Sequence, residues 1–244
     1  MEKWRERIEA AGVFCVLLLV LALSMRRTMV RTAHITLPDT GAGAAEFHRE
    51  DRYALVEVNP RTVRAAAAAL QRPDSYRRDL TITWYWEGGS GSCKAASTVY
   101  LPWTRIDLTL PDGRVRHVLT NEEEVCVWYD GETAVYRGAA AGLSADAEQW
   151  IPRWEDVLDL NAESIRAADY RLLGGVPCIY VDTVELSGQE RRYWVSVNDG
   201  LLAAAEWLEE GRTVYQMEAS PAESWEPDPA PFTLPDGTMV TPVP

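Results

Sequence analysis

Residues Leu80–Glu87 read LTITWYWE, and this stretch decides the fold class. Its large apolar side chains occupy every second position, namely Leu80, Ile82, Trp84 and Trp86. The positions between them hold two threonines, a tyrosine and a glutamate. A period of two is the period of a β-strand, in which successive side chains point to opposite faces. The stretch therefore predicts a strand with two chemically distinct faces.

Short runs of the same type follow along the chain, separated by turn residues. After a Gly/Ser loop at 88–92 we expect strands at Ala95–Leu101, Trp103–Leu110, Arg114–Leu119, Val125–Tyr129 and Ala134–Arg137. A second series is expected at Cys178–Leu186, Arg191–Val197, Leu201–Glu209 and Thr213–Met217. The turns between them include Pro111-Asp112-Gly113 and the hairpin signal Asp130-Gly131. Closely spaced strands joined by short turns indicate an antiparallel meander.

A first helix is expected ahead of these strands. Asn59-Pro60 has the form of an N-cap followed by proline at the first helical position. The alanine run at 65–69 favours a helix, and Arg72-Pro73 ends it. Because alanine is small, such a helix can lie close to a sheet.

A helical insert is expected between the two series of strands, at Ser144–Asn161. Four apolar residues fall at the i, i+4, i+7 and i+8 positions of one helical stripe: Trp150, Trp154, Val157 and Leu158. We expect this stripe to face the sheet. Residues Ile165–Tyr170 are expected to form a further helical turn that leads into a strand.

The N-terminal segment is apolar from Ala10 to Met25 and contains no charged residue there. Sixteen helical residues at about 1.5 Å each span roughly 24 Å, and Arg26 and Arg27 can extend the reach by snorkelling. We therefore expect residues 1–31 to be a signal anchor and residues 32–52 to be a linker. A cleaved signal peptide remains the alternative, since Ala22 and Ser24 supply small residues. In both cases the remainder is exported, so we expect a single-pass protein of the cell membrane with its bulk outside the cytoplasm.

Charge is divided unevenly between the anchor and the rest of the chain. Residues 1–31 hold six basic and three acidic residues, whereas the whole chain carries −13, so residues 32–244 carry −16. A body this acidic repels phosphate backbones, and it shows no basic stripe. The charge therefore argues against a nucleic-acid partner.

Three cysteines lie in the exported part: Cys93, Cys126 and Cys178. One disulfide with a free thiol and three buried thiols are both compatible with this number. Cys15 does not form a lipobox, because Phe14 precedes it and the apolar segment lies downstream. The chain has no CxxC motif and no Cys/His cluster, so no zinc site or other metal site is expected.

No group of residues has the pattern of a catalytic centre, and no cofactor is expected. His117 lies on a predicted strand, where a packed histidine is the simpler interpretation. Ser90 lies between two strands rather than in the strand-to-helix turn of a nucleophile elbow. The acidic runs at 122–124 and 155–159 are typical of solvated turns and helix faces in an acidic protein. The sequence therefore favours binding over catalysis.

The order of elements resembles the LolA/RseB-type fold. Three local matches carry the resemblance: Asn59–Tyr76, the segment Arg191–Trp207 (RRYWVSVNDGLLAAAEW), and Phe232-Thr233-Leu234-Pro235. The resemblance covers residues 53–237 and implies an α+β, mostly β fold, a curved antiparallel sheet or incomplete β-barrel with helices on its concave face. We expect the domain at 53–220, followed by a proline-rich tail at 221–244 that packs partly on it through Phe232 and Leu234.

In character the chain is similar to Gram-positive envelope relatives such as germination lipoproteins, although it lacks their lipobox. This resemblance implies an accessory or regulatory scaffold that binds a cell-wall or spore-envelope enzyme or a signalling protein. The alternative is a module that holds a lipid or a lipoprotein acyl chain in the half-barrel. Seven tryptophans are the candidate cavity residues for either ligand: Trp84, Trp86, Trp128, Trp150, Trp154, Trp194 and Trp207. Core packing is the alternative role for these residues.

Overall fold

The computed structural model describes residues 36–37, 54–55, 57–121, 123–140, 150–225, 228 and 230–240. The expected anchor at 1–31, most of the linker and the first part of the helical insert lie outside these residues. In the linker region β1 (Thr36–Leu37) pairs antiparallel with β2 (Ala54–Leu55). Among the described residues, no helix has the length and apolarity needed to cross a bilayer.

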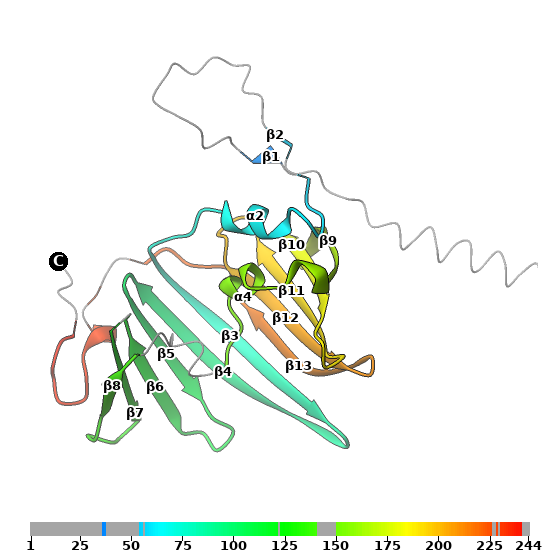
Figure 1. Cartoon of the computed structure of the whole chain (residues 1–244). Helices are drawn as coiled ribbons and strands as arrows, with labels where there is room; N and C mark the ends of the chain where they lie inside the picture. Colours follow the sequence, from blue (N-terminus) through cyan, green and yellow to red (C-terminus); the bar gives the residue numbers. More distant parts are fainter. Residues whose placement is uncertain are drawn as a thin grey trace, which may run out of the picture. The chain divides into compact units, whose positions relative to one another are not determined.

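The rest of the described chain is organised around one open sheet. Its strands are β3 (Ser75–Trp86), β4 (Gly89–Tyr100), β5 (Trp103–Thr109), β6 (Val115–Thr120), β7 (Glu124–Tyr129), β8 (Tyr136–Ala139), β9 (Ile165–Leu173), β10 (Val176–Val184), β11 (Glu190–Ser196), β12 (Leu202–Glu209) and β13 (Arg212–Ala219). The order is β8-β7-β6-β5-β4-β3-β13-β12-β11-β10-β9, with antiparallel neighbours. Two meanders are thus joined where the last strand pairs with the first. The sheet is curved and does not close, which leaves β8 and β9 as edges (Figure 1).

Two of the sequence predictions for strands are wrong. The Gly/Ser loop at 88–92 is largely strand, because β4 already begins at Gly89 and only a tight turn precedes it. A Cβ atom added at Gly89 or Gly91 would come within 3.1 Å of the Trp86 ring, so the indole occupies the space that the two glycines leave. Residues Ile165–Tyr170 form part of β9 rather than a helical turn. The 3₁₀ turn η1 (Ala162–Ser164) ends just before this strand. From Ile165 onward the backbone is extended because it pairs with β10.

Short helices cover the concave face over the β9–β13 half of the sheet (Figure 1). In α2 (Val63–Ala68) the buried residues are Val63, Ala66 and Ala67, which lets the helix approach the sheet closely. Asn59 Oδ1 accepts hydrogen bonds from Arg61 N (2.9 Å) and Thr62 N (3.2 Å) and so caps the turn that leads into α2.

The helical insert is shorter than the sequence pattern predicts. The regular helix α4 covers only Trp154–Leu158, and Arg153 N donates to Asp156 Oδ2 (2.9 Å) at its start. Trp150 lies outside the helix, has a φ of 60° and is 79% exposed, so the prediction that it faces the sheet is wrong. The reason is Pro152, which keeps the preceding residue extended and cannot continue an incoming helix. Ile151 is buried in place of Trp150.

Two hydrophobic clusters lie on opposite faces of the sheet. The main core occupies the concave face and includes α2, α4 and residues of all strands from β3 to β13 except β8. The second cluster packs the C-terminal segment with η2 (Ala230–Phe232) against β5, β6 and β7. Phe232 and Leu234 are both buried in it. The alternation of strand side chains produces both clusters, since each strand contributes every second residue to either face.

Candidate functional site

Three aromatic side chains form a continuous row on the concave face, and we call Trp84, Tyr215 and Trp207 the aromatic row. Tyr215 of β13 is the cross-strand partner of Trp84 in β3 and of Trp207 in β12. The ring centroids of Trp84 and Tyr215 are 5.9 Å apart with an edge-on geometry, and those of Tyr215 and Trp207 are 4.0 Å apart and stacked. Directly opposed side chains in adjacent strands lie close enough for such contacts, so the strand register alone assembles the row.

The row is buried at its centre and half-buried at both ends, and an exposed tryptophan lies beyond one of them. Tyr215 at its centre is 1% exposed, Trp84 and Trp207 are half-buried, and Trp86 beyond Trp84 is 59% exposed. At the other end the Arg191 guanidinium lies 5.1 Å from the Trp207 ring. Arg191 is itself paired with Glu185 at 2.9 Å, so its charge is balanced within the chain. The Trp84 end of the row is therefore continued by the exposed ring of Trp86, and the Trp207 end by the Arg191–Glu185 pair.

The remaining predicted tryptophans lie apart from the row. Trp154 packs on the main core from α4, with the Arg72 guanidinium 3.3 Å above its ring. Trp128 belongs to the second cluster on the other face, where it stacks on His117 at 5.0 Å. Trp194 also points away from the main core and contacts Tyr180 at 5.1 Å. Trp150 is exposed. The structure thus brings together Trp84, Trp86 and Trp207 of the seven candidates.

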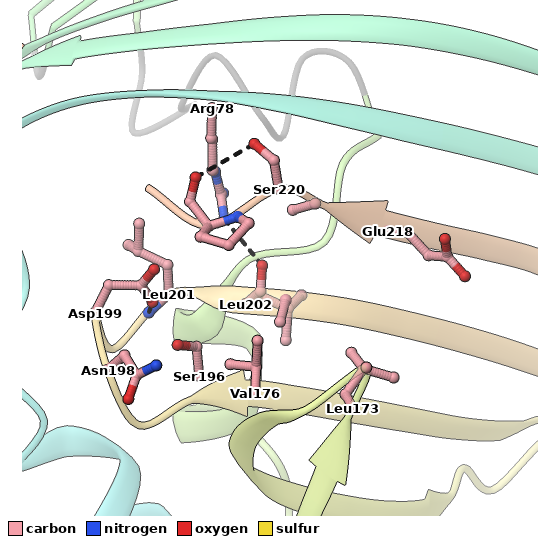
Figure 2. A pocket seen from close by; sticks show the side chains of 14 residues that line it. Arg78, Leu173, Val176, Ser196, Asn198, Asp199, Leu201, Leu202, Glu218 and Ser220 are labelled. Carbon is pink, nitrogen blue, oxygen red and sulfur yellow. Dashed lines mark hydrogen bonds between the residues drawn. The ribbon is translucent and has the colours of Figure 1, made fainter. Parts of the chain in front are cut away.

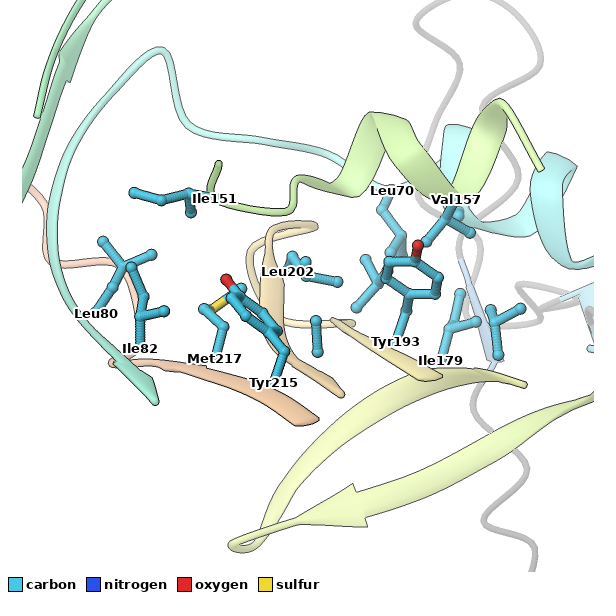
Figure 3. Packing of buried hydrophobic residues seen from close by; sticks show 14 of the residues in the cluster. Leu70, Leu80, Ile82, Ile151, Val157, Ile179, Tyr193, Leu202, Tyr215 and Met217 are labelled. Atoms are coloured by element: carbon cyan, nitrogen blue, oxygen red, sulfur yellow. The ribbon is translucent and has the colours of Figure 1, made fainter. Parts of the chain in front are cut away.

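The concave face beneath the helices is occupied by the chain's own side chains (Figure 3). Val157 of α4 and Leu70 lie over Tyr193, and Ile179 and Leu202 fill the space beside it. The relative exposures of Val157, Ile179 and Leu202 are all 0%. Four of the surface cavities in the described part of the chain have no tryptophan in their lining. This part of the concave face is therefore packed core.

A polar cluster on the opposite face was missed by sequence reasoning. Asp107 Oδ1 accepts hydrogen bonds from Arg105 Nε and from His117 Nδ1, both at 2.7 Å. Burial alone would raise the pKa of Asp107, but the hydrogen bonds from His117 and Arg105 outweigh burial and the pKa lies below its ordinary value. Arg105 Nη1 also donates to Pro231 O (2.7 Å), so the cluster anchors the C-terminal segment. His117 is 8% exposed and stacked, which matches its interpretation as a packed residue.

The three cysteines of the described chain are free and buried, so the possibility of a disulfide among them is excluded in this structure. Burial raises the pKa of Cys178 to about 11. Burial together with the neighbouring carboxylate of Glu124 does the same for the pKa of Cys126. Thiols with raised pKa values are poor nucleophiles, so these cysteines have packing roles. Within the described ranges, no three His, Cys, Asp or Glu side chains are grouped closely enough to hold a metal ion.

One helix, a six-stranded meander, a helical insert and a second meander follow in the expected order around an open curved sheet with helices on its concave face. The fold is LolA/RseB-like. The prediction of fold class and resemblance is confirmed.

Comparison with known proteins gives similarity at the level of solved structures only. No protein-family model matches the chain, and no curated protein matches it. An uncharacterised conserved protein from Thermus thermophilus is 10% identical, covering 68% of this chain and 86% of that chain, with a TM-score of 0.43. A LolA superfamily protein from Nitrosomonas europaea is 12% identical, covering 73% and 98%, with a TM-score of 0.35.

A third match is the MucA/MucB complex of Pseudomonas aeruginosa, at 14% identity and a TM-score of 0.38. It covers 67% of this chain and 54% of the matched chain, so the described fold spans about half of that protein. At TM-scores below 0.5, none of these matches indicates what this chain binds.

Proposed function

We propose that this chain is a non-catalytic binding module that docks another cell-envelope protein, held at the membrane by residues 1–31 with its bulk outside the cytoplasm. The observation that supports it best is the aromatic row together with the exposed Trp86, which follows Trp84 on the same face of β3. A half-buried tryptophan next to an exposed one, on a rigid sheet, is typical of surfaces that bind proteins. The glycines opposite them on β4 keep this surface flat.

The filled concave face favours a protein partner over a lipid. A lipid carrier needs an enclosed apolar space, whereas Tyr193, Ile179, Leu202 and Val157 fill the space under the helices. The surface that stays open at Trp86 is suited to an apolar segment of another protein. The −16 charge of residues 32–244 favours a partner with basic residues beside that segment. The Gram-positive resemblance adds a cell-wall or spore-envelope enzyme or a signalling protein as the class of partner.

Site-specific photocrosslinking in native cells tests this proposal. A benzoylphenylalanine at position 86 is expected to give one discrete protein adduct. The same residue at position 150 is the matched control, because Trp150 is also exposed but lies outside the sheet, in the segment before α4. No adduct at position 86, or equal adducts at both positions, would contradict docking at the aromatic row.

The alternative function, binding of a lipid or acyl chain, predicts a different result in the same strains. Position 86 would then crosslink to lipid, and native mass spectrometry of the purified full-length chain would show co-purified lipid. A Trp84→Ala variant would lose that lipid. A protein adduct at position 86 without co-purified lipid would instead support the docking proposal.

A further inference from the structure

The sheet is split at the end of the strands opposite to the aromatic row. Strand β13 pairs with β3 only as far as Ala219, opposite Leu80, after which Ser220 N donates to Asp79 O (2.8 Å). The chain then leaves the sheet and returns at Glu223, which pairs with Arg77. On the other side β13 pairs with β12 no further than Glu218, opposite Ala204. An opening therefore remains between β3 and the first residues of β12.

The side chain of Arg78 bridges this opening. It extends from β3 past Ser220, and its Nη1 donates to Leu202 O of β12 at 2.9 Å (Figure 2). This bond supplies Leu202 with a donor where β13 no longer provides one. Arg78 shares the parity of Leu80 and Ile82 in β3, so a long side chain is needed to cross from there to β12.

Beside Arg78 lies a cavity of about 450 Å³, between the ends of the β9–β10 and β11–β12 hairpins. Most of its walls are apolar, with Leu173 and Val176 on one side and Leu201, Ala219 and Pro221 on the others. A cavity of this volume can hold a small organic ligand. It shares no lining residue with the aromatic row, so the inference drawn from it does not rest on the proposed function.

The cation that lines the cavity lacks an ionic partner in the described part of the chain, whereas the two lining carboxylates accept hydrogen bonds. Arg78 is 6% exposed, its Nε is buried without a hydrogen-bond partner, and among the described residues no carboxylate lies within ion-pair distance of it. Its guanidinium also lies 5.9 Å from the Tyr76 ring. The two carboxylates of the lining already have donors, because Asp199 accepts from Leu201 N (3.1 Å) and Ala222 N (3.2 Å), and Glu218 accepts from Gln216 Nε2 (2.8 Å).

We infer that this cavity binds the carboxylate of a small ligand with an apolar body, with Arg78 as its counter-charge. A buried guanidinium without an ionic partner is costly, and a planar carboxylate matches its paired donors. The apolar walls accommodate the body of the ligand. With Asp199 and Glu218 in the lining, a dianionic phosphate meets more repulsion than a single carboxylate does.

Photoaffinity labelling of the full-length chain tests the inference. The probe is an eight-carbon carboxylic acid with a diazirine at its tail, and the matched control is the corresponding alcohol. The acid is expected to label the peptides around residues 173–176 and 201–203, and octanoate is expected to compete. Arg78→Met should reduce this labelling about tenfold or more, the usual loss for a charged hydrogen bond, whereas Arg78→Lys should retain part of it.

A second variant distinguishes loss of ligand binding from a folding defect in Arg78→Met. Leu173→Trp fills the cavity without removing the Arg78–Leu202 bond, and it should also abolish labelling while the circular dichroism spectrum stays unchanged. The inference fails if acid and alcohol label equally, if neither variant reduces labelling, or if no cavity peptide is labelled. It also fails if octylamine or octyl phosphate competes better than octanoate, since the site would then select a cation or a phosphate.

Discussion

Replacing Trp154 by alanine is the sharpest test of how the concave face is held together. The indole ring packs on the main core, and the Arg72 guanidinium lies 3.3 Å above it. Arg72 in turn donates to Ala67 O (2.6 Å) and Leu70 O (2.8 Å) at the C-terminal end of α2. Trp154 therefore supports α4 directly and α2 through Arg72.

The size of the effect follows from this geometry. A fully buried tryptophan costs about 3–5 kcal/mol on truncation to alanine, and a partly buried one costs roughly 2–3 kcal/mol. Loss of the cation–π contact with Arg72 adds about 1 kcal/mol. We therefore expect Trp154→Ala to lower the free energy of unfolding by about 3–4 kcal/mol. Urea denaturation of the full-length chain, followed by far-ultraviolet circular dichroism, measures this loss.

Trp150→Ala is the matched control, since Trp150 lies in the same insert and is 79% exposed. Its truncation should change the free energy of unfolding by less than about 0.5 kcal/mol. An unchanged stability of Trp154→Ala would refute the reasoning. It would mean that the insert is a lid that can leave the sheet, and the lipid-binding alternative would then gain support.

Two further predictions concern the close packing of the fold. Gly200 has a φ of +69°, and a Cβ there would lie 2.8 Å from Gln71 O, whereas Gly211 has a φ of +75° and open space around it. Gly211→Ala should lower the free energy of unfolding by about 1 kcal/mol through backbone strain alone. Gly200→Ala should lower it by at least about 1 kcal/mol more, because its Cβ also clashes with Gln71 O. Urea or thermal unfolding measures both values, and equal losses would argue against the contact. Cys126 and Cys178 have pKa values raised to about 11, so little thiolate exists near pH 8 in the folded state. Maleimide labelling mapped by mass spectrometry should be on the order of a hundredfold slower for both in native buffer than in guanidinium, and rapid native labelling would show that they are accessible.

The sequence by itself determined the class of the fold and most of its elements. The alternation in Leu80–Glu87 and in the later runs is a local property, and each such run overlaps a strand in the structure, although Ala134–Arg137 shares only two residues with β8. The existence of the first helix could be predicted because its signals, Asn59-Pro60 and the alanine run, lie within a few residues of one another. Its predicted start is too early, because Asn59 caps a turn and the helix begins at Val63 with Thr62 as its N-cap.

Of the two possibilities that the sequence left open for Cys93, Cys126 and Cys178, the structure shows three buried thiols. The strand at Gly89–Ser92 could not be predicted correctly, because its glycines and serines have the local pattern of a loop and only its pairing with β3 makes it a strand.

The tertiary structure alone decided which residues lie together. Trp84 lies beside Tyr215 because β13 pairs with β3, a contact between residues more than a hundred positions apart whose register no local pattern encodes. Trp207 joins them through the local hairpin of β12 and β13. Trp128 of β7 and Trp194 of β11 point to the opposite face because of their places in the alternation of their own strands, which residue type alone does not reveal. Arg78 shows this most clearly: as a sequence feature it is one arginine of a basic pair in β3. It becomes the buried cation of a cavity only because β13 ends early beside it and leaves the Leu202 carbonyl of β12 within its reach.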